Sequence, residues 1–239
     1  MSDDAMIAQV VGAHRALAAT GQSDLIWGHI AIRDPHGRGV WSKASGWGME
    51  DLTSDRVVLV SFDGEVLVGT GKRHLEVPIH TELMRQRPDI GATVHSHAEA
   101  AVAFASLGVP LRAISHAATP FLGDDVRRFT RTANLISTPE LGISLAEAVG
   151  DENGCLIPGH GLVAVGVDVA HAVMHAVLLE RACATQLRAM ASGPIRVWTS
   201  DAEVASKRAE IWPASSMRAA YAHLVRRAVG VRVDDLSSP

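Results

Sequence analysis

The feature that most constrains the fold of this chain is a tight turn between two runs of β-type residues. Asp63-Gly64 separates the run at 57–62 from the run at 65–69. Asp-Gly is a preferred pair for the two-residue turn of a β-hairpin, and a hairpin joins antiparallel strands. A chain that contains such a hairpin cannot fold around a purely parallel sheet.

Helix-type and strand-type segments alternate along the rest of the chain. This alternation, together with the hairpin, predicts an α/β fold with a central mixed, mostly antiparallel β-sheet flanked by helices. No repeat, low-complexity stretch or linker divides residues 1–239, which predicts a single domain with a helical C-terminal tail from about 201. The expected strands are 29–34, 40–43, 57–62, 65–69, 91–97, 111–115, 155–157 and 162–167. The expected helices before the tail are 3–20, 78–86, 98–106, 139–149 and 169–191.

The composition argues against several classes of protein. The net charge is −4 and lysine occurs at only three positions, which argues against a nucleic-acid partner. No apolar run approaches the roughly 18–20 residues of a membrane span, so no membrane association is expected. The two cysteines, Cys155 and Cys183, argue against a disulfide framework and favour a reducing, cytoplasmic location.

Twelve of the 239 residues are histidine, and three of these have the sequence context of metal ligands. His95 and His97 lie two apart in an expected strand, so their imidazoles point to the same face. His160 lies between two glycines, where the backbone can turn sharply. With the carboxylate of Glu76, three imidazoles match a catalytic divalent-metal site that leaves a position open to substrate. By spacing alone, packed or solvated histidines remain the alternative, because distant segments need not meet.

The order of the motifs carries a family resemblance. The chain reads Glu-x-Pro-x-His at 76–80, His-x-His at 95–97 and Gly-His-Gly at 159–161. Gly-His-Ile-Ala-Ile-Arg at 28–33 and Ala-Ser-Gly at 44–46 are similar to two further segments of the same family. Over nearly its whole length the chain resembles the class II aldolase/adducin family.

This resemblance implies a metalloenzyme with one divalent ion per subunit. It implies that His95, His97 and His160 are the metal ligands and that Glu76 is the acid/base carboxylate. Histidine with carboxylate suits Zn²⁺ or Mn²⁺ first, with Fe²⁺ or Co²⁺ also compatible. The family also implies a homo-oligomer, commonly a tetramer, with sites at subunit boundaries. Whether Tyr221 completes a neighbouring site stays open.

The chain departs from the family at the places where sugar-phosphate aldolases hold a phosphate. His29 stands for an asparagine, and His74-Leu75 replaces a Ser-Ser pair, whereas Ser45-Gly46 is retained. Because leucine donates no hydrogen bond to a phosphate oxygen, we expect a substrate without a phosphate group. Imidazoles suit a carboxylate or phenolate, and tryptophans around the first two segments are candidates to wall a flat ring. The expected substrate-binding residues are His29, Ser45, Gly46, His74 and His116, and the candidate tryptophans are Trp27, Trp41 and Trp47.

These departures resemble the non-phosphate branch of the family, which includes metal-dependent decarboxylases of hydroxylated aromatic or heteroaromatic dicarboxylates. The leading hypothesis is therefore a carboxy-lyase for a small-molecule carboxylate, acting through an enolate that the metal stabilises. The first alternative is a metal-dependent aldolase or epimerase for a non-phosphorylated hydroxy-carbonyl compound. The second is a non-catalytic, adducin-like interaction module, which the complete metal set at Glu76, His95, His97 and His160 disfavours.

Overall fold

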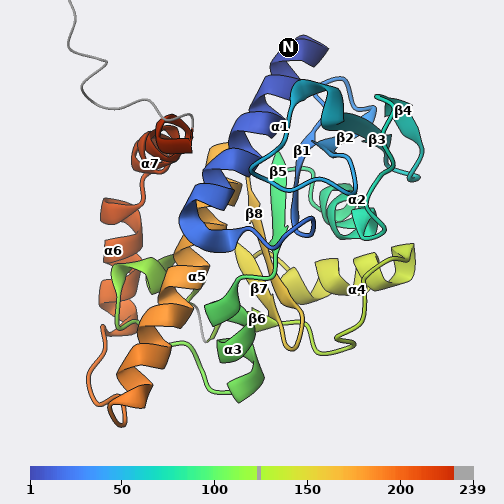
Figure 1. The fold of residues 1–239 in the computed structure, drawn as a ribbon. Coiled ribbons are helices and arrows are strands. Elements are labelled where there is room, and N and C mark those ends of the chain that lie inside the picture. Colours follow the sequence, from blue (N-terminus) through green and yellow to red (C-terminus); the bar gives the residue numbers. More distant parts are fainter. Residues whose placement is uncertain (123–124, 229–239) are drawn as a thin grey trace, which may run out of the picture.

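A single eight-stranded sheet forms the centre of the protein, and helices cover both of its faces (Figure 1). The computed structural model describes residues 1–122 and 125–228. The strand order is β4-β3-β2-β1-β5-β8-β7-β6, and every neighbouring pair is antiparallel except the parallel pair β6 and β7. The strands are β1 His29–Arg33, β2 Gly39–Lys43, β3 Val57–Ser61, β4 Val66–Val68, β5 Ala92–Ser96, β6 Arg127–Arg128, β7 Gly154–Ile157 and β8 Gly161–Gly166. This mixed sheet between helices confirms the predicted fold class.

The two faces of the sheet bury separate apolar clusters. Helices α1, α3, α5 and α7 pack on one face, together with alternate strand residues such as Ile30, Ile32 and Val94. Helices α2 and α4 pack on the other face, with Ala31 and their own apolar residues. The helices are α1 Asp3–Leu17, α2 Val77–Gln86, α3 Glu99–Leu107, α4 Pro139–Val149, α5 Val169–Ala191, α6 Asp201–Ile211 and α7 Ala214–Ala228. Because side chains alternate along a strand, His29 and His95 share the face that α2 covers.

The predicted hairpin is confirmed as the β3–β4 pair at one edge of the sheet. The backbone N–H of Ser61 donates to the carbonyl of Glu65 at 2.7 Å, and Gly64 has a φ of 90°, a left-handed value that glycine adopts without strain. The register shifts between Leu59 and Val60. The sheet therefore ends in an antiparallel hairpin, as the Asp-Gly pair predicts.

The prediction of a strand at 111–115 is wrong. The backbone N–H of Leu111 donates to the Asp125 carboxylate at 2.8 Å, and that of Arg112 donates to the Gln186 side chain at 2.7 Å. Side chains therefore take the donors that a sheet ladder would use. The two-residue strand β6 was not predicted, because so short a pairing has no periodicity to detect.

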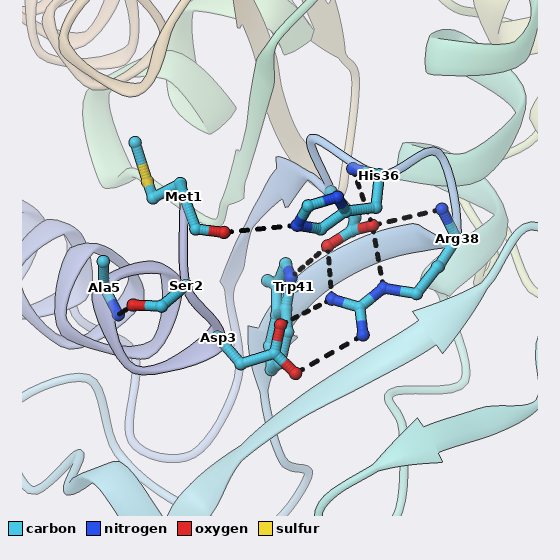
Figure 2. Close-up of polar contacts among 8 residues, drawn as sticks. Met1, Ser2, Asp3, Ala5, His36, Arg38 and Trp41 are labelled. Atoms are coloured by element: carbon cyan, nitrogen blue, oxygen red, sulfur yellow. Dashed lines mark hydrogen bonds and ion pairs between the residues drawn. The ribbon is translucent and has the colours of Figure 1, made fainter.

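Trp41 faces away from the side of the sheet that carries the histidines. Its ring is fully buried in the cluster under α1, and its Nε1 donates to the Asp34 carboxylate at 2.9 Å. Arg38 lies beside this ring and bridges Asp34 at 2.8 Å to Asp3 at 2.6 Å (Figure 2). Hydrogen bonds from Arg38 hold the pKa of the Asp34 carboxyl well below its usual range. Trp41 thus stabilises the core, and its candidacy as a wall for a substrate ring is wrong.

Within the described ranges 1–122 and 125–228, no helix combines the length and the apolarity needed to cross a membrane.

Candidate metal centre and the cavity beside it

Four side chains from three separate parts of the chain converge at one end of the sheet. His95 is on β5 and His97 follows that strand, His160 lies in the turn between β7 and β8, and Glu76 is the N-cap residue of α2. Each offers one ligand atom, and these atoms all lie within 4.8 Å of one another. The structure therefore brings together all four residues expected at the metal site.

In two of the histidines, a hydrogen-bond partner determines which ring nitrogen carries the proton. Nδ1 of His95 donates to the carbonyl of Leu162 at 3.0 Å, and Nδ1 of His97 lies 2.8 Å from the Asp24 carboxylate. Carbonyl and carboxylate oxygens accept hydrogen bonds, so each Nδ1 carries the proton and each Nε2 keeps its lone pair. Metal-binding histidines typically have such a partner on the nitrogen that does not bind the metal.

The remaining nitrogens supply a direct test of whether these residues fit a metal ion. Among the residues that the structure describes, Nε2 of His95, Nε2 of His97 and both ring nitrogens of His160 are buried without a hydrogen-bond partner. Buried polar atoms without partners are uncommon, and the binding of a metal ion is one explanation for a group of them. The three imidazoles and the Glu76 carboxylate would hold a divalent ion, which would give one nitrogen of each ring a partner.

Glu76 connects this centre to the rest of the fold. Its Oε2 lies 3.6 Å from Nε2 of His95 and its Oε1 lies 3.5 Å from Nε2 of His160. Oε1 also accepts a hydrogen bond from the backbone N–H of Ile136 at 2.8 Å. Burial acts to raise the pKa of the Glu76 carboxyl, but the close approach of His160 and His95, together with the hydrogen bond from Ile136, outweighs burial and lowers the pKa below its usual range. The carboxyl group is therefore ionised at neutral pH.

The two glycines beside His160 let the turn approach β5 closely. Gly159 has a φ of 72° in this turn. A Cβ on Gly161 would lie 2.4 Å from the carbonyl oxygen of Ser96 and 3.2 Å from the His97 ring. Only glycine at this point allows β8 to begin against the end of β5, which is what places His160 next to the other two histidines.

A cavity of about 120 Å³ opens beside the metal centre and shares Glu76 with it. Three of the expected substrate-binding residues, His29, Ser45 and His74, line this cavity. Its other lining residues are Trp27, Gly28, Leu75 and Leu135. His29 lies directly opposite His95 in the β1–β5 pairing, which explains why the cavity adjoins the metal ligands.

Two expected substrate-binding residues lie elsewhere. Gly46 follows Ser45 but does not line the cavity. His116 begins the short 3₁₀ helix His116–Phe121, where its carbonyl accepts a hydrogen bond from Trp212. Of the candidate tryptophans, Trp27 borders the cavity, whereas the exposed Trp47 is stacked with Arg56 at 3.5 Å.

The side chain of Tyr221 packs against the apolar cluster of its own chain. Burial raises the pKa of its hydroxyl group to about 12, with a further contribution from Asp168.

Lys43 is a residue of this region that sequence reasoning missed. Its ammonium group is buried behind the cavity and lies 2.8 Å from the carbonyls of Ile26 and Trp47 and 3.2 Å from Nε2 of His74. An ammonium has three protons, and three acceptors surround it here. Burial lowers the pKa of Lys43 to about 8, and burial together with the Lys43 charge lowers that of His74 to about 2. A lysine that ends a short strand whose burial pattern is otherwise that of core residues was the available signal.

Comparison with known proteins identifies the family. The family model for the class II aldolase and adducin N-terminal domain matches residues 8–187. The chain is 31% identical over 195 residues to a 3,4-dihydroxyphthalate decarboxylase of Arthrobacter keyseri, covering 75% of this chain and 76% of the relative. It is 29% identical over 171 residues to a 5-methylthioribulose-1-phosphate/5-deoxyribulose-1-phosphate aldolase of Rhodospirillum rubrum, covering 72% of this chain and 75% of the relative. Among solved structures, an L-fuculose 1-phosphate aldolase of Glaciozyma antarctica matches 97% of this chain and 91% of its own, with a TM-score of 0.83 and 24% identity. The chain therefore belongs to the class II aldolase/adducin family.

Proposed function

We propose that this protein is a divalent-metal-dependent lyase that decarboxylates a small hydroxylated aromatic or heteroaromatic dicarboxylic acid. The observation that carries the proposal is the lining of the cavity beside Glu76. His29 and His74 stand there with Leu75, where the phosphate-binding relatives are expected to carry small hydrogen-bond donors. Imidazole N–H groups bind carboxylate and phenolate oxygens through charge-assisted hydrogen bonds.

The lining of the cavity supports a substrate built on one flat ring. Trp27, Leu75 and Leu135 give it apolar walls, while the two imidazoles and Ser45 give it polar groups. Such a mixture suits a flat ring that carries carboxylate and hydroxyl substituents.

Each residue of the proposed site has a separate role in the decarboxylation. A bound divalent ion supplies a Lewis acid that stabilises negative charge on oxygen next to the bond that breaks. The ionised carboxylate of Glu76 accepts the proton of the substrate hydroxyl and delivers it to the ring carbon that bears the carboxylate. The bond from that carbon to the carboxylate then breaks, the electron pair returns to the ring, and CO₂ leaves. His29 and His74 hold the anionic substituents in place during these steps.

An aldolase for a non-phosphorylated hydroxy-carbonyl compound is the second candidate. Ser45 supports it, because this hydroxyl belongs to a loop that resembles the one sugar-phosphate aldolases use, and it still lines the cavity. The relative from Rhodospirillum rubrum is named as an aldolase, whereas the relative from Arthrobacter keyseri is named as a decarboxylase. Both reactions use a metal ion and a proton-transferring carboxylate at the same place.

The test is to incubate the metal-loaded protein with hydroxylated benzene- and pyridine-dicarboxylates and to measure CO₂. Release of CO₂ from at least one of these acids is expected, with Zn²⁺ or Mn²⁺ as the first ions to try. Cleavage of a hydroxy-carbonyl compound without CO₂ release from any of the acids would replace the decarboxylase by the aldolase.

Two variants separate metal binding from proton transfer. Glu76→Gln keeps the three imidazoles, so we expect it to retain bound metal but to lose at least roughly 100-fold in kcat, since the amide cannot carry the proton. His95→Ala is expected to lose the metal itself, as measured by elemental analysis of the purified protein. Full activity of Glu76→Gln would remove Glu76 from the acid/base role, and a metal-free wild-type protein unaffected by His95→Ala would favour a non-catalytic module.

A further inference from the structure

A buried chain of hydrogen bonds runs from the cavity into the core behind His29. Nδ1 of His29 lies 2.6 Å from Nε2 of His80, and Nδ1 of His80 lies 2.5 Å from the hydroxyl oxygen of Thr93. His29, His80 and Thr93 are at most 2% exposed and come from β1, α2 and β5 respectively. The other ring nitrogen of His29, Nε2, is left for whatever occupies the cavity, which the His29 ring lines.

The hydrogen bond between the two imidazoles requires one donor and one acceptor. Both rings are at most 2% exposed, and burial disfavours a charged imidazole, so both rings are neutral in this chain. A neutral imidazole carries one N–H, so only two proton arrangements satisfy the chain. In the first, Nε2 of His29 carries a proton towards the cavity; in the second, it presents a lone pair.

The hydroxyl group of Thr93 decides between these arrangements. Within the described part of the chain, its one hydrogen-bond partner is Nδ1 of His80. If that nitrogen carried a proton, the threonine hydroxyl would accept it, and its own proton would be buried without an acceptor, which is unfavourable. If the hydroxyl donates to Nδ1 of His80, then Nε2 of His80 donates to Nδ1 of His29. The proton of His29 is then on Nε2.

We propose that Thr93 and His80 are positioning residues that fix the tautomer of His29, so that its Nε2–H group points into the cavity as a hydrogen-bond donor. His29 therefore selects for an oxygen that carries negative charge or a lone pair. A lone pair at Nε2 would instead repel such an oxygen. That this oxygen belongs to a carboxylate or phenolate rests on the proposed function, whereas the tautomer itself does not.

The tautomer can be measured without any turnover. The probe is full-length protein loaded with Zn²⁺ and labelled with ¹⁵N in its histidines, and His29→Gln identifies the His29 signals in the NMR spectrum. We expect Nε2 of His29 to be the protonated nitrogen in the wild-type protein. Thr93→Val, which keeps the shape but removes the hydroxyl, should give a mixture of tautomers or the Nδ1–H form. Thr93→Ser restores the hydroxyl and should restore the wild-type spectrum.

A matched control is available one residue from His80. Thr81 lies on α2 and, like Thr93 on β5, is a buried threonine. Its hydroxyl donates to the carbonyl of Val77 at 3.4 Å and takes no part in the hydrogen-bond chain to His29. Thr81→Val should leave the His29 signals unchanged. An Nδ1–H form of His29 in the wild-type protein would overturn the inference, and so would a Thr93→Val spectrum identical to that of the wild type.

Binding of phthalate to the same zinc-loaded proteins separates this inference from the proposed function. By calorimetry, Thr93→Val should bind phthalate about tenfold more weakly than the wild type, whereas Thr93→Ser and Thr81→Val should bind it as the wild type does. Equal binding by Thr93→Val would contradict the role of the tautomer in recognition. A wild-type protein that has the Nε2–H tautomer but binds no phthalate would contradict the proposed substrate class and support the positioning role.

Discussion

At the scale of single residues, burial keeps most of the informative histidines neutral. His14 on α1 shows this outside the candidate metal centre: its Nε2 accepts a hydrogen bond from the backbone N–H of Ile30 at 3.0 Å, and its Nδ1 donates to the carbonyl of Val10 at 2.8 Å. Burial lowers the pKa of His14 to about 3, that of His80 to about 3 and that of His175 to about 4. Each of these rings connects strands or helices as a neutral hydrogen-bonding group.

These histidines predict that the protein loses stability in mild acid. The unfolded chain takes up protons below about pH 6.5 while the folded rings do not, so the free energy of unfolding falls as the pH drops from 6.5 towards 3. Each buried neutral histidine contributes a loss of about 1.4 kcal/mol per pH unit in this window. Urea denaturation of the metal-free protein at a series of pH values measures the slope.

His14→Gln provides the matched test, because the glutamine oxygen can still accept the Ile30 hydrogen bond. Below pH 6.5 we expect the free energy of unfolding of the variant to fall less steeply with decreasing pH than that of the wild type. The difference in slope should correspond to the uptake of about one proton. Identical slopes in the two proteins would show that His14 is not held neutral.

At the scale of elements, the metal centre depends on how closely β8 approaches β5. His160 reaches the other ligands because β8 starts at Gly161, directly against the carbonyl oxygen of Ser96. The Gly-His-Gly motif thus serves the pairing of two strands, and the ligand lies in the turn that this pairing positions.

Gly161→Ala is expected to weaken metal binding without touching a ligand. The added Cβ would lie 2.4 Å from a backbone oxygen, so β8 must move away from β5 and carry His160 with it. We expect metal affinity to fall roughly 10–100-fold, as it does when the groups that orient ligands are disturbed. Competition with a chelator of known affinity measures the change.

Gly108→Ala is the control for a general loss of stability. Gly108 has a φ of 65° at the end of α3, and a Cβ there meets nothing within 4 Å. The variant should lose about 1 kcal/mol of stability through backbone strain and keep its metal affinity. Equal metal affinities for Gly161→Ala and the wild type would contradict the proposed importance of this approach.

At the scale of the whole molecule, apolar side chains surround the mouth of the cavity. Trp27, Leu75 and Leu135 line the cavity and are 51%, 67% and 53% exposed. Leu25, next to this rim, is 72% exposed. Grouped exposed apolar residues mark surfaces that bind a partner. From the family resemblance we expect a homo-oligomer in which a second copy of the chain covers this rim.

The expected assembly is a tetramer with four times the 25.3 kDa mass of the chain, measured by light scattering after size-exclusion chromatography. Leu75→Lys places a charge in the rim and should shift the mass towards smaller species. Val197→Lys changes an equally apolar residue that is 84% exposed and lies in the segment between α5 and α6, and it should leave the mass unchanged. A wild-type protein that elutes as a monomer would contradict the proposal.

The sequence by itself determined the features that depend on neighbouring residues. The Asp-Gly turn predicted the hairpin and excluded a parallel sheet, and the residue motifs identified the family and the four residues that the structure brings together at the candidate metal centre. Spacing and turn chemistry are local properties, so they can be read without knowing which segments meet. The prediction of a strand at 111–115 failed because the side chains of Asp125 and Gln186 accept hydrogen bonds from its backbone N–H groups. Both residues lie outside the segment that a local pattern covers.

Only the tertiary structure decided which residues surround the candidate metal ligands and the cavity. It placed Lys43 against His74, linked His29 through His80 to Thr93, and put Trp41 on the opposite face of the sheet. The hydrogen-bonded pairs among these contacts join residues that are 13 to 51 positions apart. They depend on strand register and on which helix covers which face, and both are set by long-range packing rather than by any local pattern.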